Sequence, residues 1–308
     1  MLENQQTDTF EQYFEREIIP LVEEDNRRKD AYRGRFWGAF WSALFIFSAN
    51  TLWVLFNSLM YGHALNYEQI LLVAIVAGLI VVWPIYSYYR QPRLDIFEAF
   101  LRFYGDWKYK TSGKVRLVHS RIIPQHDDVF AMHNISGTPE NIKTEIRDTC
   151  YQKDVLLKNK TWKRTVSSGV IVYLTFPHNF KADILVFDKN GFYRKNKFPE
   201  LTMVEPKLEV PASNYFRCFT DNTEAAQRII ISFFFEAILD LKEVFAAKSI
   251  NIEIKDNYIR VYLEDSTLYF TNYKFWSRKV DKNKFRQIHA ELCKITEFIQ
   301  IMKVLADV

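Results

Sequence analysis

Two long stretches near the start of this 308-residue chain contain no charged side chain. The first lies between Arg35 and Glu68 and is 32 residues long, and the second lies between Glu68 and Arg90 and is 21 residues long. A helix of about 20 apolar residues spans the roughly 30 Å hydrocarbon layer of a bilayer. The sequence therefore predicts two transmembrane helices, residues 36–56 and 69–89, joined by a short loop.

Aromatic side chains gather toward the ends of both stretches, as in the interfacial belts of membrane proteins. They are Trp37, Trp41, Trp53, Trp83, Tyr86, Tyr88 and Tyr89. A buried helical hairpin of a soluble protein, the alternative, explains these belts less well. A cleaved secretory signal is also disfavoured, because 35 largely polar residues precede the first stretch.

Basic residues flank the two predicted spans, whereas the loop between them, residues 57–68, contains no Lys or Arg. The flanking residues are Arg27, Arg28, Lys29, Arg33, Arg35, Arg90 and Arg93. By the positive-inside rule we expect both termini in the cytoplasm and the loop outside. Residues 1–35 should then form a cytoplasmic juxtamembrane helix, capped by Asp8 or Thr9 and kinked or interrupted at Pro20.

Small and polar residues within the spans indicate how the two helices pack. Small residues recur at helical spacing, which permits close helix approach in the hairpin or, less economically, in an oligomer. They are Gly34, Gly38, Ser42, Ala74 and Gly78. Asn50 is the one strongly polar residue, and we expect it to hydrogen-bond to the other helix. A pore assembled from several hairpins is disfavoured, because no charged residue lies within the spans.

The charge is unevenly divided along the chain. The whole chain has a formal net charge of +4, residues 1–89 carry −4, and residues 90–308 therefore carry +8. An anionic membrane surface attracts such a basic segment, by about 1 kcal/mol for each nearby Lys or Arg. The three cysteines are widely separated and lie on the predicted cytoplasmic side, so we expect no disulfides.

Residues 90–308 are long enough for one substantial core, and their pattern indicates an α+β domain. A helix is expected after Pro92, followed by strands at 128–133, 142–151, 169–176, 182–187, 200–210 and 215–220. A single helix should run from Asp221 or Asn222 to about Ala247. Residues 250–254 and 258–263 alternate around Asp256-Asn257, which predicts a β-hairpin, and a long helix starts at Asp281. This order predicts a mainly antiparallel sheet with long packing helices.

The sequence contains no recognisable catalytic motif. Glycine-rich nucleotide loops, HExxH and GxSxG are all absent. Cys218 with His178 or His289 would have the residue types of a nucleophile pair, but Cys218 lies in an alternating strand where a buried thiol is ordinary. We therefore predict that the protein is not an enzyme and that it carries no cofactor.

One cluster has the residue types of a metal site. It comprises His119, His126, Asp127, Asp128 and His133, and imidazole with carboxylate is a common ligand set for divalent metals. Pro124 interrupts any helix here, and in a strand His126 and His133 would face opposite sides. Surface or capping histidines explain the cluster better, so His119, His126, Asp128 and His133 stay as the alternative metal ligands.

Basic and aromatic residues are interleaved in patches that match an anionic surface. The residues are Lys158, Lys160, Trp162, Lys163, Arg164, Trp276, Arg278, Lys279, Lys282 and Lys284. Such patches suit anionic lipid headgroups or nucleic acid, or they are solvated loops and helix ends. Because the predicted domain is held at a bilayer, we expect lipid contact and no nucleic acid.

Three segments carry a family resemblance: FEQYFEREIIP near the N-terminus, FPHNFKADILVF, and NYFRCFTDNTEAAQRII. Together with the two-span hairpin they resemble an uncharacterised family of bacterial two-pass membrane proteins, domain of unknown function 3137. Where that family has Gly and Arg in the second segment, this chain has Ala182 and Asp183. The resemblance implies a bacterial inner membrane and supplies no catalytic residues.

The leading hypothesis is a non-enzymatic, membrane-anchored interaction or scaffold domain, with residues 1–35, 36–89 and 90–308 as its three parts. Its partners would be the lipid bilayer, a protein that the sequence does not identify, and another copy of the chain in a homo-oligomer. The alternative is an enzyme or ligand-binding domain with a dispersed, metal-dependent site. A small oligomeric pore is the third hypothesis.

Overall fold

The computed structural model describes residues 9–62, 64, 67–90, 96–114, 120–157, 160–189, 198, 200–205, 215–267 and 282–306. The chain divides into two compact units. One comprises Met1–Ala99 and Thr271–Lys282, and the other comprises Phe100–Phe270 and Asn283–Val308. In the described residues the first unit is helical, and the second contains a β-sheet with its covering helices.

The first unit begins with a capped helix that changes its hydrogen bonding before Pro20. The helical elements are α1 (Phe10–Tyr13), a π-helical turn η1 (Phe14–Ile18), α2 (Ile19–Tyr61) and α3 (Tyr67–Arg90), followed by α4 (Ile96–Arg102). Thr9 and Gln12 form a capping box, as predicted for Thr9. The Ile19 N–H donates to the Phe14 carbonyl, so a π-helical turn stands where a kink or break was expected.

The helices α2 and α3 are long and apolar enough to cross a membrane. They contain the two spans predicted at residues 36–56 and 69–89. Only 11% of the most apolar window of each helix is buried within the structure. The core helix of a soluble protein would bury its apolar face, so this exposure indicates membrane association.

The two apolar helices are joined by the polar contact expected of Asn50. The Gln69 Nε2 donates to the Asn50 Oδ1 at 3.0 Å, which confirms an interhelical hydrogen bond. The glycine prediction is wrong for the hairpin. A Cβ added at Gly34, Gly38 or Gly78 would meet nothing within 4 Å, so among the described residues these glycines do not mediate helix approach.

The second unit is built on a nine-stranded sheet in which every described pairing is antiparallel. Its order is β1-β2-β3-β4-β9-β8-β5-β7-β6. The strands are β1 (Lys108–Lys114), β2 (Asp128–Gly137), β3 (Lys143–Leu157), β4 (Lys160–Thr175), β5 (Ile184–Asp188), β6 (Thr202–Val204), β7 (Phe216–Thr220), β8 (Ser249–Lys255) and β9 (Tyr258–Glu264). A short 3-10 turn, η2 (Pro139–Asn141), joins β2 to β3. The α+β class and the antiparallel sheet are confirmed.

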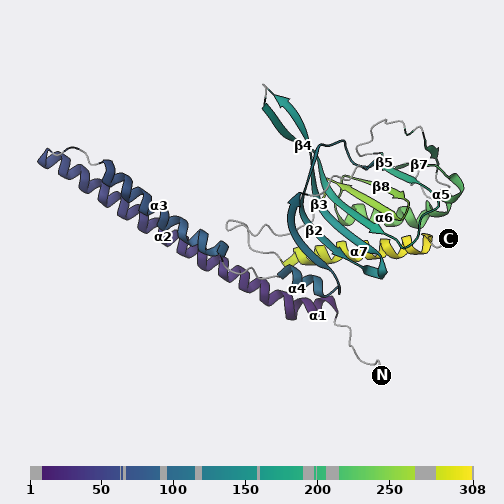
Figure 1. The fold of residues 1–308 in the computed structure, drawn as a ribbon. Coiled ribbons are helices and arrows are strands. Elements are labelled where there is room, and N and C mark those ends of the chain that lie inside the picture. The colour runs from purple at the N-terminus through teal and green to yellow at the C-terminus, as the bar shows by residue number, and fades with distance from the viewer. Residues whose placement is uncertain are drawn as a thin grey trace. The chain divides into compact units, whose positions relative to one another are not determined.

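Helices cover one face of this sheet (Figure 1). They are α5 (Thr223–Ile229), α6 (Ser232–Val244) and α7 (Lys282–Ala306). The apolar positions of the central strands alternate with polar ones, and the buried set includes Ile252, Val261 and Leu174. Because alternate residues of a strand point to opposite faces, the intervening residues lie on the face away from these apolar side chains. That second face holds the candidate site.

The helix predicted from Asp221 or Asn222 to Ala247 is two helices. Asn222 caps α5 through its side chain, as expected, but α5 ends at Ile229 and α6 begins at Ser232. Ile230 and Ile231 leave helical geometry, with ψ angles of 56° and 173°. The three consecutive β-branched residues Ile229–Ile231 lower helix propensity there, and Ile229 and Ile230 are buried.

The strands β3 and β4 extend far beyond the predicted segments 142–151 and 169–176. They pair continuously out to Leu157 and Lys160 and project from the sheet as a hairpin (Figure 1). The register shifts after Tyr151, where β4 has one extra residue, Val166. Such a β-bulge bends a strand and increases its twist, which explains why the outer part of the hairpin leaves the sheet.

Helix α7 contains a buried acid that makes stability depend on pH. Glu291 is 1% exposed, and among the described residues neither of its oxygens has a well-aligned hydrogen-bond partner. Burial raises the pKa of Glu291 to about 8, and Gln287 only partly opposes this. The folded protein therefore keeps a proton that the unfolded chain releases above pH ~4.3.

We predict that the free energy of unfolding of the wild-type protein falls as the pH rises from about 5 to about 8. Over this range Glu291 is protonated in the folded protein and ionised in the unfolded chain, so folding takes up a proton, which becomes less favourable at higher pH. Glu291→Gln should remove this slope and raise stability at pH 8 by roughly 1–4 kcal/mol. The measurement is thermal unfolding of the full chain in neutral detergent across this range. Glu297→Gln, on the same helix but exposed, is the control. Parallel pH profiles for wild type and Glu291→Gln would contradict the prediction.

Candidate functional site

A row of charged and aromatic side chains crosses the sheet face opposite the helix-covered apolar side chains. The register places Glu253 of β8 opposite Arg260 of β9, and Arg260 opposite Tyr173 of β4. The Arg260 guanidinium lies 4.1 Å from the centre of the Tyr258 ring and 5.9 Å from that of Tyr173. Cation–π contacts of this kind hold the arginine against the sheet.

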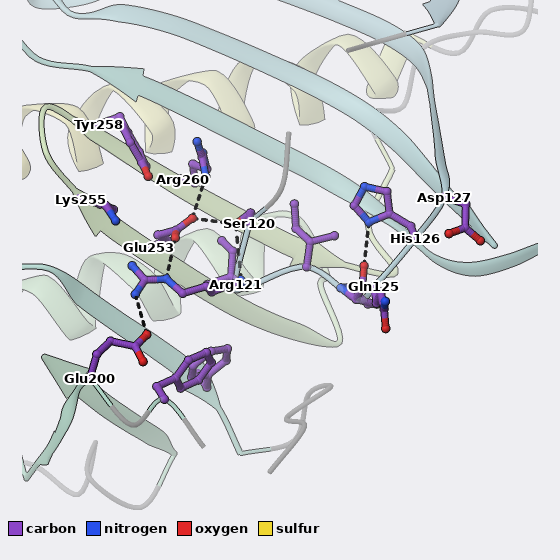
Figure 2. Close-up of a pocket in the computed structure, with 15 residues that line it drawn as sticks. Ser120, Arg121, Gln125, His126, Asp127, Glu200, Glu253, Lys255, Tyr258 and Arg260 are labelled. Carbon is purple, nitrogen blue, oxygen red and sulfur yellow. Dashed lines mark hydrogen bonds and ion pairs between the residues drawn. The ribbon is translucent and has the colours of Figure 1, made fainter. Parts of the chain in front are cut away.

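The carboxylate of Glu253 is the centre of the site. Its side chain is 3% exposed, and it accepts hydrogen bonds from three donors. Ser120 Oγ lies 2.7 Å away, Arg121 Nε 3.1 Å and Arg260 Nη1 2.9 Å (Figure 2). A buried carboxylate without such partners would cost several kcal/mol of folding free energy, so these three donors stabilise the buried side chain of Glu253.

Arg121 connects Glu253 to two further acids. Its Nη2 donates to Asp183, and its Nη1 lies 3.7 Å from Glu200. Burial alone would lower the pKa of Arg121, but Asp183 and Glu253 raise it. Lys255 lies 3.8 Å from Asp183. The site thus brings together three cationic and three anionic side chains, which balance in formal charge.

All of these charged residues except Asp183 line an open cleft of about 770 Å³ (Figure 2). One wall is the segment Ser120–Asp127, and another is the sheet, with Glu253 and Arg260. Phe187 and Phe198 add an aromatic wall, because their rings stack at 5.7 Å with an interplanar angle of 9°. A cleft of this size, with an aromatic wall and polar groups fixed by hydrogen bonds, is large enough to hold a small molecule.

The predicted metal ligands are not assembled into a metal site within the described residues. No group of three His, Cys, Asp or Glu side chains there could hold a metal ion, and His119 lies outside the described residues. His126 Nδ1 bonds the Pro124 carbonyl at 2.7 Å, and Asp128 pairs with Lys163. His126 and Asp127 line one end of the cleft instead (Figure 2).

His133 has a separate partner on the sheet. Its Nδ1 lies 2.7 Å from the Tyr109 hydroxyl, and burial lowers the pKa of His133 to about 4. A neutral imidazole suits metal binding, but the hydrogen bond uses the Nδ1 atom. His133 is therefore best explained as part of the β1–β2 pairing.

The thiol of Cys218 is unsuited to act as a nucleophile. Cys218 lies in β7 with 1% exposure, and burial raises its pKa to about 12. A thiol with such a pKa remains protonated, and the thiolate is the reactive form. Near His289 the structure places Cys293 instead, with Sγ 3.7 Å from Nε2, and burial raises the pKa of that thiol as well.

The outer β3–β4 hairpin carries the first predicted basic-aromatic patch. Trp162 and Leu156 are 61% and 76% exposed, and Lys163 and Arg164 are also exposed. The register pairs Lys153 with Arg164 and Val155 with Trp162, so these four side chains share one face of the ribbon. Lys158 lies outside the described residues, and Lys160 is placed only by its backbone in β4.

The second patch is described only in part. Trp276, Arg278 and Lys279 lie outside the described residues. Lys282 is exposed and forms an ion pair with Glu23 at 3.1 Å, and Lys284 is half-buried in the first turn of α7. The hairpin is therefore the better described of the two predicted surfaces.

Sequence reasoning missed the cleft, although one signal for it was present. The predicted hairpin around Asp256-Asn257 is confirmed, and its two-residue loop fixes Glu253 opposite Arg260. A paired acid and base within an otherwise apolar alternation indicates a buried charge pair. Ser120 and Arg121 had no such signal, because they meet Glu253 across 133 and 132 residues of sequence.

The fold and the cleft define an α+β domain joined in one chain to two apolar helices. Residues 165–304 match the family described as "Protein of unknown function (DUF3137)", which confirms the resemblance to a domain of unknown function for that part of the chain. The match includes Asp183, Glu253 and Arg260, whereas Ser120 and Arg121 lie before it.

The other comparisons add little. No curated protein matches the chain. Among solved structures, the mycobacterial trehalose monomycolate transport factor A, TtfA, matches with a TM-score of 0.38 and 10% sequence identity, covering 66% of this chain and 92% of that chain. A likeness at this level carries no inference about function.

The Glu253 network gives a prediction about stability. Glu253→Ala leaves the partly buried Arg121 and Arg260 without their shared carboxylate and should destabilise the protein by about 3 kcal/mol. Glu200→Ala removes a 56% exposed acid from the same arginine and should cost less than about 0.5 kcal/mol. Chemical denaturation of the full chain in detergent measures both. Similar losses for the two variants would show that Glu253 is not the centre of the network.

Proposed function

We propose that this protein is a non-enzymatic, membrane-anchored interaction protein of the bacterial inner membrane. The helices α2 and α3 would anchor it as a two-pass hairpin, and the sheet domain would recruit a protein partner on the cytoplasmic side. The low burial of the apolar helix windows supports the anchor. The basic residues before α2 and after the second span support cytoplasmic termini.

The observation that supports contact between the sheet domain and the membrane surface is the projecting β3–β4 hairpin. Residues 152–165 contain five Lys or Arg and one Asp, a net charge of +4, equal to that of the entire chain. Trp162 and Leu156 expose large apolar surface in the same hairpin. Tryptophan favours the membrane–water interface, and basic side chains are attracted by anionic headgroups. The hairpin therefore matches an anionic membrane surface in both charge and apolarity.

A second function, ligand binding by the sheet domain, is favoured by the cleft around Glu253. It is compatible with the proposed membrane contact, because the cleft and the β3–β4 hairpin use different residues. The metal-dependent version of this alternative has no support from the described residues. The small oligomeric pore remains a third hypothesis.

The proposed topology predicts opposite accessibility of the loop and the C-terminus. A Gly62→Cys variant, made in a chain whose Cys150 and Cys293 are replaced by Ser, should react with a membrane-impermeant maleimide in intact cells. A protease site appended after Val308 should be cut only in inverted vesicles. Labelling and cleavage from the reverse sides would overturn the orientation, and recovery of the full chain in solution without detergent would overturn the anchor.

The proposed hairpin contact predicts a dependence on lipid charge. A fluorophore on Leu156→Cys, in the same Ser background, should be quenched by nitroxide lipids when the full chain is reconstituted into vesicles containing phosphatidylglycerol. It should be unquenched in pure phosphatidylcholine or at high salt. Each basic residue contributes about 1 kcal/mol to binding an anionic membrane surface. The double variant Lys153→Glu, Arg164→Glu should therefore weaken the contact at least about tenfold.

Matched controls separate the hairpin from general charge and general apolarity. Lys143→Glu with Lys248→Glu makes the same change of charge at exposed positions outside the hairpin. Phe233→Ala truncates a 67% exposed aromatic residue on α6 and is the control for Trp162→Ala. Equal effects of hairpin and control variants, or quenching that ignores lipid charge, would refute the contact. Quenching that appears only when a partner protein is added would assign the hairpin to that partner.

A further inference from the structure

We propose that the cleft around Glu253 binds a small organic anion, a carboxylate or a phosphate monoester, that also carries an aromatic ring. This inference is independent of the membrane contact, because the cleft and the β3–β4 hairpin use different residues. The acidic and basic side chains of the cleft differ in how completely their hydrogen-bonding capacity is used.

The best-buried acid of the cleft has most of its acceptor capacity used by side chains of the protein itself. Glu253 accepts from Ser120, Arg121 and Arg260 and is 3% exposed. The Asp127 Oδ2 accepts the Asp154 N–H at 2.9 Å. A ligand cation would have to displace these internal donors and leave them unpaired, which is costly for buried groups.

Two cationic side chains, by contrast, retain donors that face no close acceptor among the residues that the structure describes. Arg121 Nη1 is 3.7 Å from Glu200, and Lys255 Nζ is 3.8 Å from Asp183. Both distances exceed those of a hydrogen bond, and both side chains line the cleft. A carboxylate or phosphate of a ligand would supply the acceptors that these two donors lack.

Glu200 is the acid that such a ligand would displace. It is 56% exposed and reaches Arg121 only at ion-pair distance, so it holds the guanidinium weakly. Arg121 itself is held firmly by Glu253 and Asp183, so its remaining N–H groups stay in place when Glu200 moves. A rigid donor that faces an exchangeable acid is a preorganised anion site.

The aromatic side chains of the cleft wall indicate that the ligand carries an aromatic ring. Phe198 is half-buried and stacked on Phe187, and both line the cleft. Tyr258 lines the cleft as well and already holds Arg260 against its ring. An inorganic anion would leave the partly exposed rings of Phe198 and Tyr258 in water, whereas an aryl group would cover them, and offset ring stacking adds to the gain.

The test uses 4-fluorophenyl phosphate and 4-fluorobenzoate as probes, followed by ¹⁹F NMR with the full chain in neutral detergent. We expect saturable binding of at least one probe, and the tighter one identifies the acidic group. Lys255→Gln should weaken binding about fivefold, and Glu200→Gln should strengthen it about fivefold, since each changes one partly exposed charge. Competition by inorganic phosphate should be at least tenfold weaker than by phenyl phosphate, a difference of about 1.4 kcal/mol.

Lys248→Gln is the matched control, because Lys248 is 60% exposed, forms an ion pair with Asp265 and does not line the cleft. All three substitutions alter side chains that are at least 43% exposed, so the variants should fold, which thermal unfolding verifies. Four results would each overturn the proposal. They are no saturable binding of either probe, equal affinity in Lys255→Gln and Lys248→Gln, no gain in Glu200→Gln, and equal competition by inorganic phosphate.

Discussion

The buried carboxylate of Glu253 is the constraint on which the sheet unit's second face depends. A carboxyl group that is 3% exposed is tolerated only where donors surround it, and here the three donors come from two separate parts of the chain. Ser120 and Arg121 belong to the segment before β2, and Arg260 belongs to β9. The network therefore fixes this segment against the sheet. The cleft exists because that attachment leaves open space beside it.

The sheet unit and the helices α2 and α3 differ in where their large apolar side chains lie. In the sheet unit large apolar side chains are buried, in part under the helix layer and in part in a cluster with Ile122 and Ile123. In α2 and α3 large apolar side chains such as Trp53, Leu59 and Leu79 are each more than 60% exposed. Large apolar side chains with this exposure are more stable in lipid than in water, and the hydrogen bond from Gln69 to Asn50 pairs two amides that lipid would leave unsolvated.

The sequence could predict those parts of the structure in which local periodicity and burial agree. The apolar helices, the Asp256-Asn257 hairpin and the strands β5 and β7 follow from such patterns. The outer half of β3 and β4 could not be predicted in this way, because residues 152–165 are mostly polar and are not buried against a core. Their strand structure depends on backbone pairing with each other, which hydrophobic alternation does not reveal.

The candidate site was predictable only in its local half. The loop of the 256–257 hairpin fixes Glu253 opposite Arg260 without any tertiary information. The other half depends on a segment more than 130 residues earlier, whose residues Ser120 to Asp127 form no regular element. Long-range contacts of irregular segments have no periodic signal, so Arg121 and the aromatic wall at Phe198 became visible only in the folded chain.

The cleft and the hairpin are connected through one short stretch of backbone. The Asp127 N–H donates to the Gln152 carbonyl at 2.8 Å, and the Asp127 Oδ2 accepts the Asp154 N–H. The next residue, Asp128, pairs with Lys163 on the opposite strand of the hairpin. The segment that carries Ser120 and Arg121 into the cleft thus also holds the base of the hairpin on both strands.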